Sequence, residues 1–209
     1  MVLFNGISII IYTQVLIHSK GYVMIINLKK LLPLLLIFLS FFSLTPINAA
    51  EIPSDMQYQD TKLILNGHGT RTMFFAKIYE SGLYLESANT NAEEIISQDS
   101  VMGIRLEVIS SMLTSEKMKN ALNEALIKST NDNTQPIVSQ ISQLMATIND
   151  VEVGDVYEFI YLPESGIDVI KNTKHLDTVA GLDFKKAFFG IWISNNPVQK
   201  SLKKAMLGN

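Results

Sequence analysis

The sequence predicts an α+β fold in which a large antiparallel sheet is covered by helices on one face. Three observations indicate this class: strands stand before and after a pair of helices, most strands alternate apolar and polar residues, and short turns separate the later strands. Short turns join antiparallel neighbours, whereas parallel strands need long crossovers. No internal repeat is visible, so a single domain is expected over residues 51–209.

A glycine-rich stretch, residues 65–86, is predicted to organise the first half of this domain. A weakly alternating strand at 61–65 leads into Gly67 and Gly69, which mark a tight turn or bulge because glycine tolerates positive φ angles. This placement puts Arg71 at the start of the next strand, just after the turn.

The next strand, residues 74–84, is bulky and alternates in polarity. Gly82 interrupts it and indicates a bulge. A short helix over 91–98 is expected to be capped by Asn91, and an alternating strand follows at 101–111.

Two amphipathic helices are predicted in the middle of the domain. Thr114 can cap a helix of about 15 residues that begins at Ser115, and Pro136 opens a second that extends to Ile148. Each has one apolar stripe, which is expected to be buried by packing against a sheet. The remaining predicted elements are strands at 155–162, 167–171 and 175–179, an aromatic-rich helix capped by Asp183, and a last helix opened by Asn196-Pro197.

The N-terminal region resembles a secretory leader. Residues 24–50 carry two lysines, a long apolar run and a small-residue exit, which together predict a signal peptide cut after Ala49 or Ala50. The mature protein is then expected in the periplasm without a permanent membrane span, an uncleaved anchor being the alternative. Because Met24 restarts a complete leader, we interpret residues 1–23 as a translation-start artefact or an extra leader.

Composition narrows the possible functions. Residues 51–209 retain 14 of the 17 basic residues and all 20 acidic ones, a net charge of −6 that disfavours nucleic acid as a partner. The absence of cysteine excludes thiol catalysis and disulfides. His68 and His175 are placed in separate turns without metal-ligand spacing, so no metal and no cofactor are expected. Lys185 and Lys186 are interpreted as part of a solvated helix face.

Four segments of the domain resemble the chalcone isomerase family, in particular its bacterial exported branch: NGHGTRTMFFAKIYESGLYLES, SEKMKNALNEA, VGDVYEFIYLPESGIDV and NNPVQKSLKKAMLG. The resemblance covers essentially all of residues 51–209. It implies an open-faced β-sandwich, with a cleft between the large sheet and the helices.

The resemblance also implies site residues. Arg71 matches the arginine that stabilises an oxyanion in the plant enzymes, and a guanidinium offers a fixed charge and a planar fork of donors for that task. Tyr79, Thr114, Ala121 and Ile191 stand where those enzymes carry other polar groups. Since Ala121 and Ile191 can donate no hydrogen bond, formation of a flavanone is not expected.

Three functions follow from this comparison. The first is a non-catalytic binder that holds a small apolar carboxylate, such as a fatty acid, with Arg71, Tyr79 and Thr114. Its cleft would be lined by Ala121, Phe188, Ile191 and Trp192, although the aromatic stripe around Phe188 also fits a plain core. The second is an isomerase or intramolecular lyase that uses Arg71 and Tyr79 on an unknown substrate, and the third is an interaction protein of the envelope.

Overall fold

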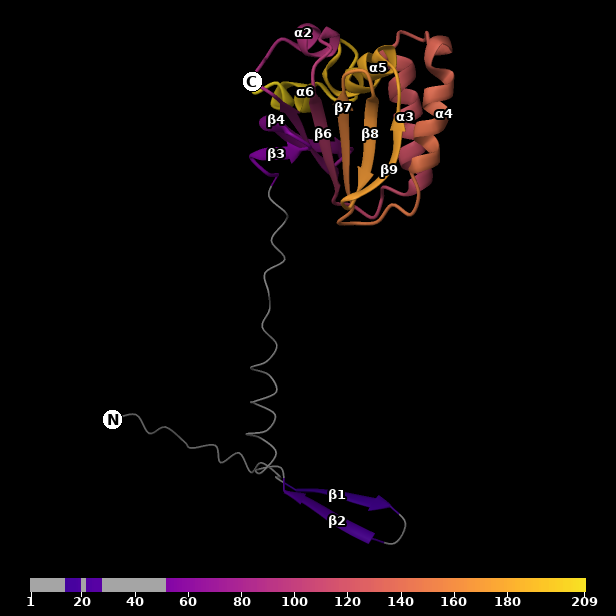
Figure 1. Cartoon of the computed structure of the whole chain (residues 1–209). Coiled ribbons are helices and arrows are strands. Elements are labelled where there is room, and N and C mark those ends of the chain that lie inside the picture. Colours follow the sequence, from indigo (N-terminus) through magenta and orange to yellow (C-terminus); the bar gives the residue numbers. More distant parts are fainter. Residues whose placement is uncertain (1–13, 20–21, 28–51) are drawn as a thin grey trace, which may run out of the picture. The chain divides into compact units, whose positions relative to one another are not determined.

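The computed structural model describes residues 14–19, 22–27 and 52–209, and the chain divides into two units, Met1–Ala49 and Ala50–Asn209 (Figure 1). In the first unit, β1 (Gln14–Ser19) pairs antiparallel with β2 (Tyr22–Asn27). Most of the predicted leader at 24–50 and of the segment 1–23 lies outside the described residues. Export therefore stays a prediction.

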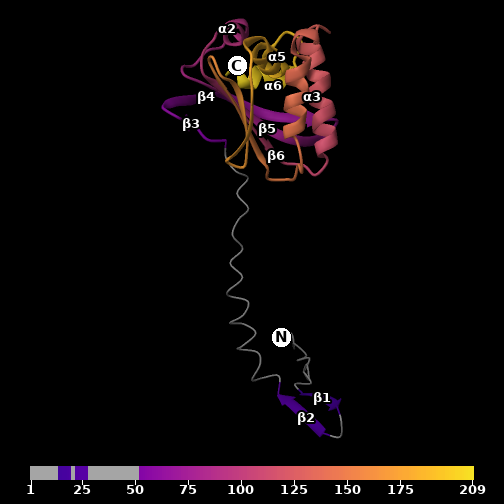
Figure 2. The same ribbon diagram turned by 45° about the vertical axis from the view of Figure 1, so that its right-hand side comes forward.

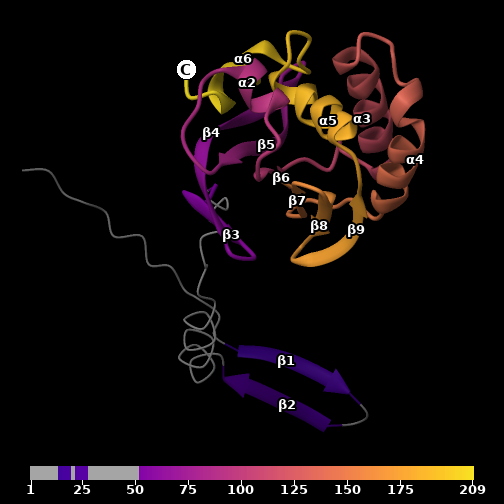
Figure 3. The same ribbon diagram turned by 45° about the horizontal axis from the view of Figure 1, so that its top comes forward.

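The second unit is built on a seven-stranded sheet in which each strand pairs antiparallel with the next along the chain. Its strands are β3 (Asp55–Tyr58), β4 (Thr61–Met73), β5 (Ala76–Leu85), β6 (Met102–Val108), β7 (Val156–Leu162), β8 (Gly166–Lys171) and β9 (Lys174–Val179). Figure 3 shows that the sheet curls, with β3 and β9 at the two ends of the arc. The curl brings the Tyr58 hydroxyl on β3 to the Asp168 carboxylate on β8, to which it donates at 2.6 Å.

The helices pack mainly on one face of this sheet, as predicted. They are α2 (Ala92–Ser97), α3 (Ser115–Ser129), a short 3₁₀ turn (Gln135–Ile137) leading into α4 (Val138–Thr147), α5 (Leu182–Ile193) and α6 (Lys200–Met206). Figures 1 and 2 show α3 and α4 side by side, with α5 next to them. The α+β class with an antiparallel sheet is thus confirmed. No helix among the described residues is long and apolar enough to cross a bilayer.

The hydrophobic core of the second unit is self-contained. Its larger cluster fills the space between the sheet and the helices, and a smaller one around Ile52, Leu63 and Tyr84 lies under the curled end of the sheet. Every buried residue of both clusters lies between Ile52 and Leu207. We therefore expect residues 51–209 to fold as a separate domain, which stays a prediction.

Gly67 and Gly69 do not form the predicted turn, because β4 continues through both glycines, but the alternative of a bulge is confirmed, since the pairing with β5 is irregular between Leu65 and Gly67. A Cβ at Gly67 would overlap the carbonyl oxygen of Ala205 and lie 2.9 Å from that of Met206, and both of these belong to α6. Glycine is needed here so that the backbones of α6 and β4 can approach each other closely. A glycine required by a turn and a glycine required by a close backbone contact cannot be told apart in the sequence.

The reversal of the chain occurs instead at Phe74 and Phe75, which join β4 to β5. Met73 and Ala76 form the last strand pair before this two-residue loop. Arg71 consequently lies near the end of β4, just before the turn rather than after it.

The predicted bulge at Gly82 is also misplaced. The irregular pairings leave Asn66 unpaired on β4 and Ile78 unpaired on β5. Gly82 keeps regular register, and a side chain there would crowd Leu65 at 3.0 Å. Its small size again serves packing.

The helix ends follow the predicted capping only in part. Asn91 and Thr114 accept hydrogen bonds from the backbone N–H three residues on, at 3.2 and 3.3 Å, as capping residues do. Asp183 lies inside the first turn of α5 rather than before it, and the helix expected from Pro197 begins only at Lys200.

The prediction that Lys185 is solvated is wrong: its side chain is fully buried on α5. Its ammonium donates to the carbonyl oxygens of Ile95, Ile96 and Gln98 at the end of α2, the first two at 3.0 and 2.9 Å. A lysine thus satisfies carbonyls that a helix end leaves without partners. Burial lowers the pKa of Lys185 to about 8, against a smaller opposing effect of the Asp99 carboxylate.

We expect this lysine to make stability depend on pH. Between pH 8 and 10.5 the unfolded chain keeps a proton that the folded chain has released, so raising the pH favours the folded state. The free energy of unfolding of the wild type should therefore rise across this range relative to Lys185→Met, measured by urea denaturation. Lys186→Met, on the same helix, should change the free energy of unfolding by less than about 0.5 kcal/mol. A difference between wild type and Lys185→Met that is flat or falls with pH contradicts the assignment.

Candidate functional site

A cleft of about 150 Å³ lies between the strands β4 to β6 and the helices α3 and α5. Most of its wall is apolar, and polar groups enter it at few points. The residues that line it are Arg71, Met73, Ile78, Tyr79, Leu106, Leu113, Met118, Ala121, Leu122, Glu124, Ala125, Lys128, Ile191, Trp192 and Val198. The curled sheet supplies one side of the cleft and the helical layer the other.

Arg71 is held in place by the segment before α6. Its Nη1 donates to the backbone oxygen of Thr72 at 2.8 Å and to Oε1 of Gln199 at 3.0 Å. The same oxygen of Gln199 accepts from the Thr72 N–H at 2.9 Å, and Nε2 of Gln199 donates to the oxygen of Thr70 at 3.3 Å. Of the three guanidinium nitrogens of Arg71, only Nη1 has a hydrogen-bond partner among the described residues. Nε and Nη2 thus remain available to a ligand.

Tyr79 stands directly opposite Arg71 in the pairing of β5 with β4. Side chains of such pairs share one face of a sheet, with Cβ atoms about 4.5–5.5 Å apart. The Tyr79 hydroxyl accepts a hydrogen bond from Nε1 of Trp192 at 3.1 Å. No described residue accepts a hydrogen bond from this hydroxyl, so its proton can be donated into the cleft.

The environment keeps Tyr79 neutral. Burial raises the pKa of Tyr79 to about 12, although the hydrogen bond from Trp192 and the nearby Arg71 charge act in the opposite direction. At physiological pH the residue is a hydrogen-bond donor, as a tyrosine with an ordinary pKa also is, and burial shifts it further from the phenolate form. Arg71 and Tyr79 together present a positive charge and a neutral donor to the same space.

The mouth of the cleft is marked by its exposed lining residues: Met73, Ala121, Glu124 and Lys128. They come from the end of β4 and from α3. Glu124 and Lys128 bear opposite charges that are open to solvent and therefore largely screened. The fixed charge inside the mouth is that of Arg71.

Five of the residues singled out from the sequence line this cleft: Arg71, Tyr79, Ala121, Ile191 and Trp192. The structure brings them together from the hairpin of β4 and β5 and from the helices α3 and α5, which lie much further along the chain. Whether any of them binds a ligand stays a prediction.

Thr114 and Phe188 do not line the cleft. Thr114 is exposed and uses its hydroxyl to cap α3, while Leu113 takes the lining position. Phe188 is fully buried, with ring centroids 4.8 Å from Phe159 and 5.3 Å from Trp192. The alternative that the aromatic stripe is core holds for Phe188, because this ring points into the packed layer behind the cleft.

Two kinds of site residue are not among those predicted from the sequence: the apolar lining residues of α3, and Gln199. Met118, Leu122 and Ala125 belong to the apolar stripe of α3, which predicts packing against the sheet, yet they also line the cleft. A usable signal was the pair Ala121 and Ala125, because small residues one helical turn apart leave room between a helix and a sheet. Gln199 was also missed, and nothing local distinguishes it from a solvated glutamine.

A second polar cluster lies on the sheet away from this cleft. The Asp168 carboxylate accepts from Tyr58 and Thr178 and lies 3.3 Å from Nε2 of His175. His175 is part of β9, and His68 is part of β4, so their predicted placement in turns is wrong. The described residues contain no group of three or more histidine, aspartate or glutamate side chains arranged to hold a metal ion.

Comparison with known proteins gives two findings. A sequence model of the family described as chalcone isomerase-like matches residues 45–208. The solved structure of a fatty-acid binding protein from Arabidopsis thaliana is similar, with a TM-score of 0.60 and 14% sequence identity, and the match covers 75% of this chain and 90% of that chain. At this identity the likeness shows the fold. No curated protein matches the sequence.

The Tyr79 to Trp192 hydrogen bond can be tested through stability. Tyr79→Phe leaves the indole N–H of Trp192 buried without an acceptor, which should lower the free energy of unfolding by about 1–3 kcal/mol. Tyr157→Phe is the matched control, because that hydroxyl makes only a long contact of 3.5 Å to Asn149, and its loss should be smaller. Urea denaturation measures both, and equal losses contradict the proposed role of the bond.

Proposed function

The chain belongs to the chalcone isomerase-like family, and we propose that its folded domain is a non-catalytic binder of a small apolar carboxylate such as a fatty acid. One observation carries the proposal: Arg71 and Tyr79 face one another at the edge of a cleft whose remaining walls are almost wholly apolar. A carboxylate is the anion that matches a guanidinium fork, and an apolar wall favours a hydrocarbon tail.

The placement of the two polar groups supports a defined orientation of the ligand. The carboxylate would accept from the free nitrogens of Arg71 and from the hydroxyl of Tyr79. The tail would then contact the buried side chains of Ile78, Leu106 and Leu122. The fatty-acid binding protein from Arabidopsis thaliana, which shares the fold, makes this class of ligand a natural first candidate.

The volume of the cleft limits the ligand. About 150 Å³ is less than the roughly 300 Å³ at which pockets for drug-sized ligands begin. The cleft therefore suits a short-chain carboxylate, or the head and first carbons of a longer one whose tail leaves through the mouth.

The electrostatics favour binding over catalysis. A general acid works best with a pKa near the operating pH, and Tyr79, with a pKa of about 12, is far too weak an acid for that role. Ala121 and Ile191 add no donor to the cleft. An isomerase or intramolecular lyase would have only Arg71 and the neutral hydroxyl of Tyr79 to stabilise an oxyanion.

A protein that only binds other proteins of the envelope does not require an open cleft. Tyr79 and Trp192 occupy part of the space, yet the cleft remains open beside them. We therefore place ligand binding ahead of a role as an envelope interaction protein.

We further propose that the domain acts after export, because residues 24–50 have the composition of a cleavable leader. N-terminal sequencing of the protein recovered from producing cells should begin at Ala50 or Glu51. Recovery of a chain that begins at or before Met24 would show that this leader is not removed.

The ligand proposal is tested with residues 51–209 and a series of saturated carboxylates of increasing length, using native mass spectrometry and titration calorimetry. Arg71→Ala should weaken binding by about 10- to 100-fold, because it removes a charge-assisted hydrogen-bond partner. Arg71→Lys should give an intermediate affinity, since the charge is kept and the fork is lost.

Lys128→Ala is the matched control for a general effect of charge. It removes a cation from the exposed mouth, where screening is strong, and should change affinity less than about twofold. If no carboxylate binds the wild type, or if Arg71→Ala and Lys128→Ala have equal effects, the proposed site is refuted.

A further inference from the structure

The loop between β4 and β5 exposes two large aromatic side chains to solvent. Phe74 is 91% exposed and Phe75 is 102% exposed, and among the large apolar side chains of residues 52–209 the next most exposed is Val153 at 57%. Neither ring packs against the core of the domain. Their presence at this loop is therefore not explained by folding.

The backbone at Phe74 makes this observation stronger. Phe74 has a φ of 54°, and Phe75 does not share a positive φ. Two-residue hairpins with a positive φ only at the first central position usually carry glycine there, because a side chain is disfavoured. A bulky residue with positive φ is an outlier, so its retention points to a use outside the folded chain.

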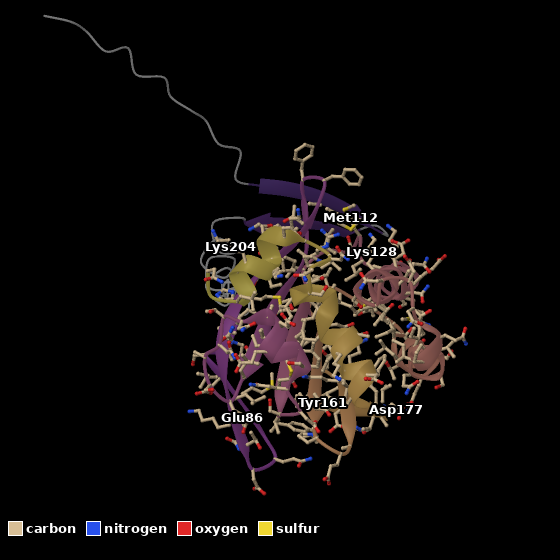
Figure 4. All side chains as sticks on the ribbon, turned by 90° about the horizontal axis from the view of Figure 1, so that it is seen from above. Glu86, Met112, Lys128, Tyr161, Asp177 and Lys204 are labelled. Carbon is tan, nitrogen blue, oxygen red and sulfur yellow. The ribbon has the colours of Figure 1, made fainter. Side chains whose placement is uncertain are left out.

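Two methionines extend this apolar surface toward the cleft. Met73 is 44% exposed and also lines the cleft mouth, and Met112 is 50% exposed on the loop after β6. That loop lies next to the base of the hairpin, since the Ile109 N–H donates to the oxygen of Ile78 on β5. We call Met73, Phe74, Phe75 and Met112 the apolar tip. Figure 4 shows Met112 on the same side of the domain as Lys128, which lines the cleft mouth.

We propose that the apolar tip inserts into the interfacial layer of a phospholipid bilayer and so places the mouth of the cleft at the membrane surface. Exposed apolar patches mark protein or membrane contacts. A narrow projection that ends in aromatic rings fits the boundary between headgroups and acyl chains. Apart from Met73, which also lines the cleft mouth, this surface lies outside the ligand site, and the proposal goes beyond the proposed function.

The size of the tip argues against a second copy of the chain as the occupant. A phenylalanine side chain buries about 150–250 Å² at most. The four phenylalanine rings of two tips packed face to face would therefore bury at most about 1,000 Å², which is less than the roughly 1,200 Å² that the smallest stable protein interfaces bury. A bilayer has no such requirement, because it accepts the rings one by one.

The charges around the tip predict what kind of bilayer binds. Lys77, Lys128 and Arg71 lie near the tip, but they are balanced by Glu80, Glu124 and a net charge of −6 for residues 51–209. Attraction to anionic lipid is therefore weak. Binding should be driven by apolar insertion and should change little with salt.

The test is sedimentation of residues 51–209 with phosphatidylcholine vesicles that contain no free carboxylate, so that the result does not depend on the cleft. The double variant Phe74→Ser and Phe75→Ser should lower vesicle binding at least about tenfold. Val138→Ser with Val153→Ser is the matched control, since these side chains are 53% and 57% exposed elsewhere, and it should bind as the wild type does.

A second variant separates binding from folding. Phe74→Gly relieves the positive φ, so it should unfold at a higher temperature than the wild type and still bind vesicles less well. Three results overturn the proposal: no vesicle binding by the wild type, equal binding by the serine tip variant, or a concentration-dependent dimer that the tip variant abolishes while vesicles remain unbound.

Discussion

The close approach of α6 to β4 is the contact on which the site depends. Gly67 has no side chain that would separate the two backbones, and Asn66 next to it donates to the oxygen of Met206 at 2.9 Å. This contact fixes the segment before α6, which carries Gln199 to the end of β4. Gln199 in turn holds the guanidinium of Arg71 and the backbone of Thr72. A packing constraint between a helix and a strand thus determines where the anchoring charge lies.

The sequence predicted the elements better than it predicted where the chain turns. Alternation identifies β6, β7 and β8, and helical periodicity identifies α3 and α4, because burial on one face imposes these periods. Glycine is ambiguous, since both a turn and a close backbone contact require it. The hairpin at Phe74 could not be predicted, because its residues are the opposite of those that favour such a loop.

The residues of the candidate site likewise fall into those that the sequence could predict and those that it could not. Arg71, Tyr79, Ala121 and Ile191 could be placed near one another by resemblance, since each corresponds to a site position of the family, and Trp192 follows Ile191 in the aromatic stripe. Thr114 could not, because the same side chain can cap a helix or face a cleft, and the local sequence satisfies the cap first. The role of Gln199 depends on packing between residues far apart in the chain. Such a contact cannot be predicted from a motif of residues that are close in sequence.

The position of the arginine relative to the hairpin links the cleft to the tip. Met73 belongs to both the cleft mouth and the tip, and Arg71 lies two residues before it on the same strand. Under the proposed function, a carboxylate bound by Arg71 would lie close along the strand to the two most exposed large apolar side chains of the described domain, Phe74 and Phe75. An apolar carboxylate in a cell resides mainly in membranes, because its tail is poorly soluble in water. If the proposed ligand binding and the proposed bilayer insertion both hold, the cleft opens beside the membrane and its ligand can enter without the tail crossing bulk water. This would be a physical reason for the strained, exposed phenylalanine at the hairpin.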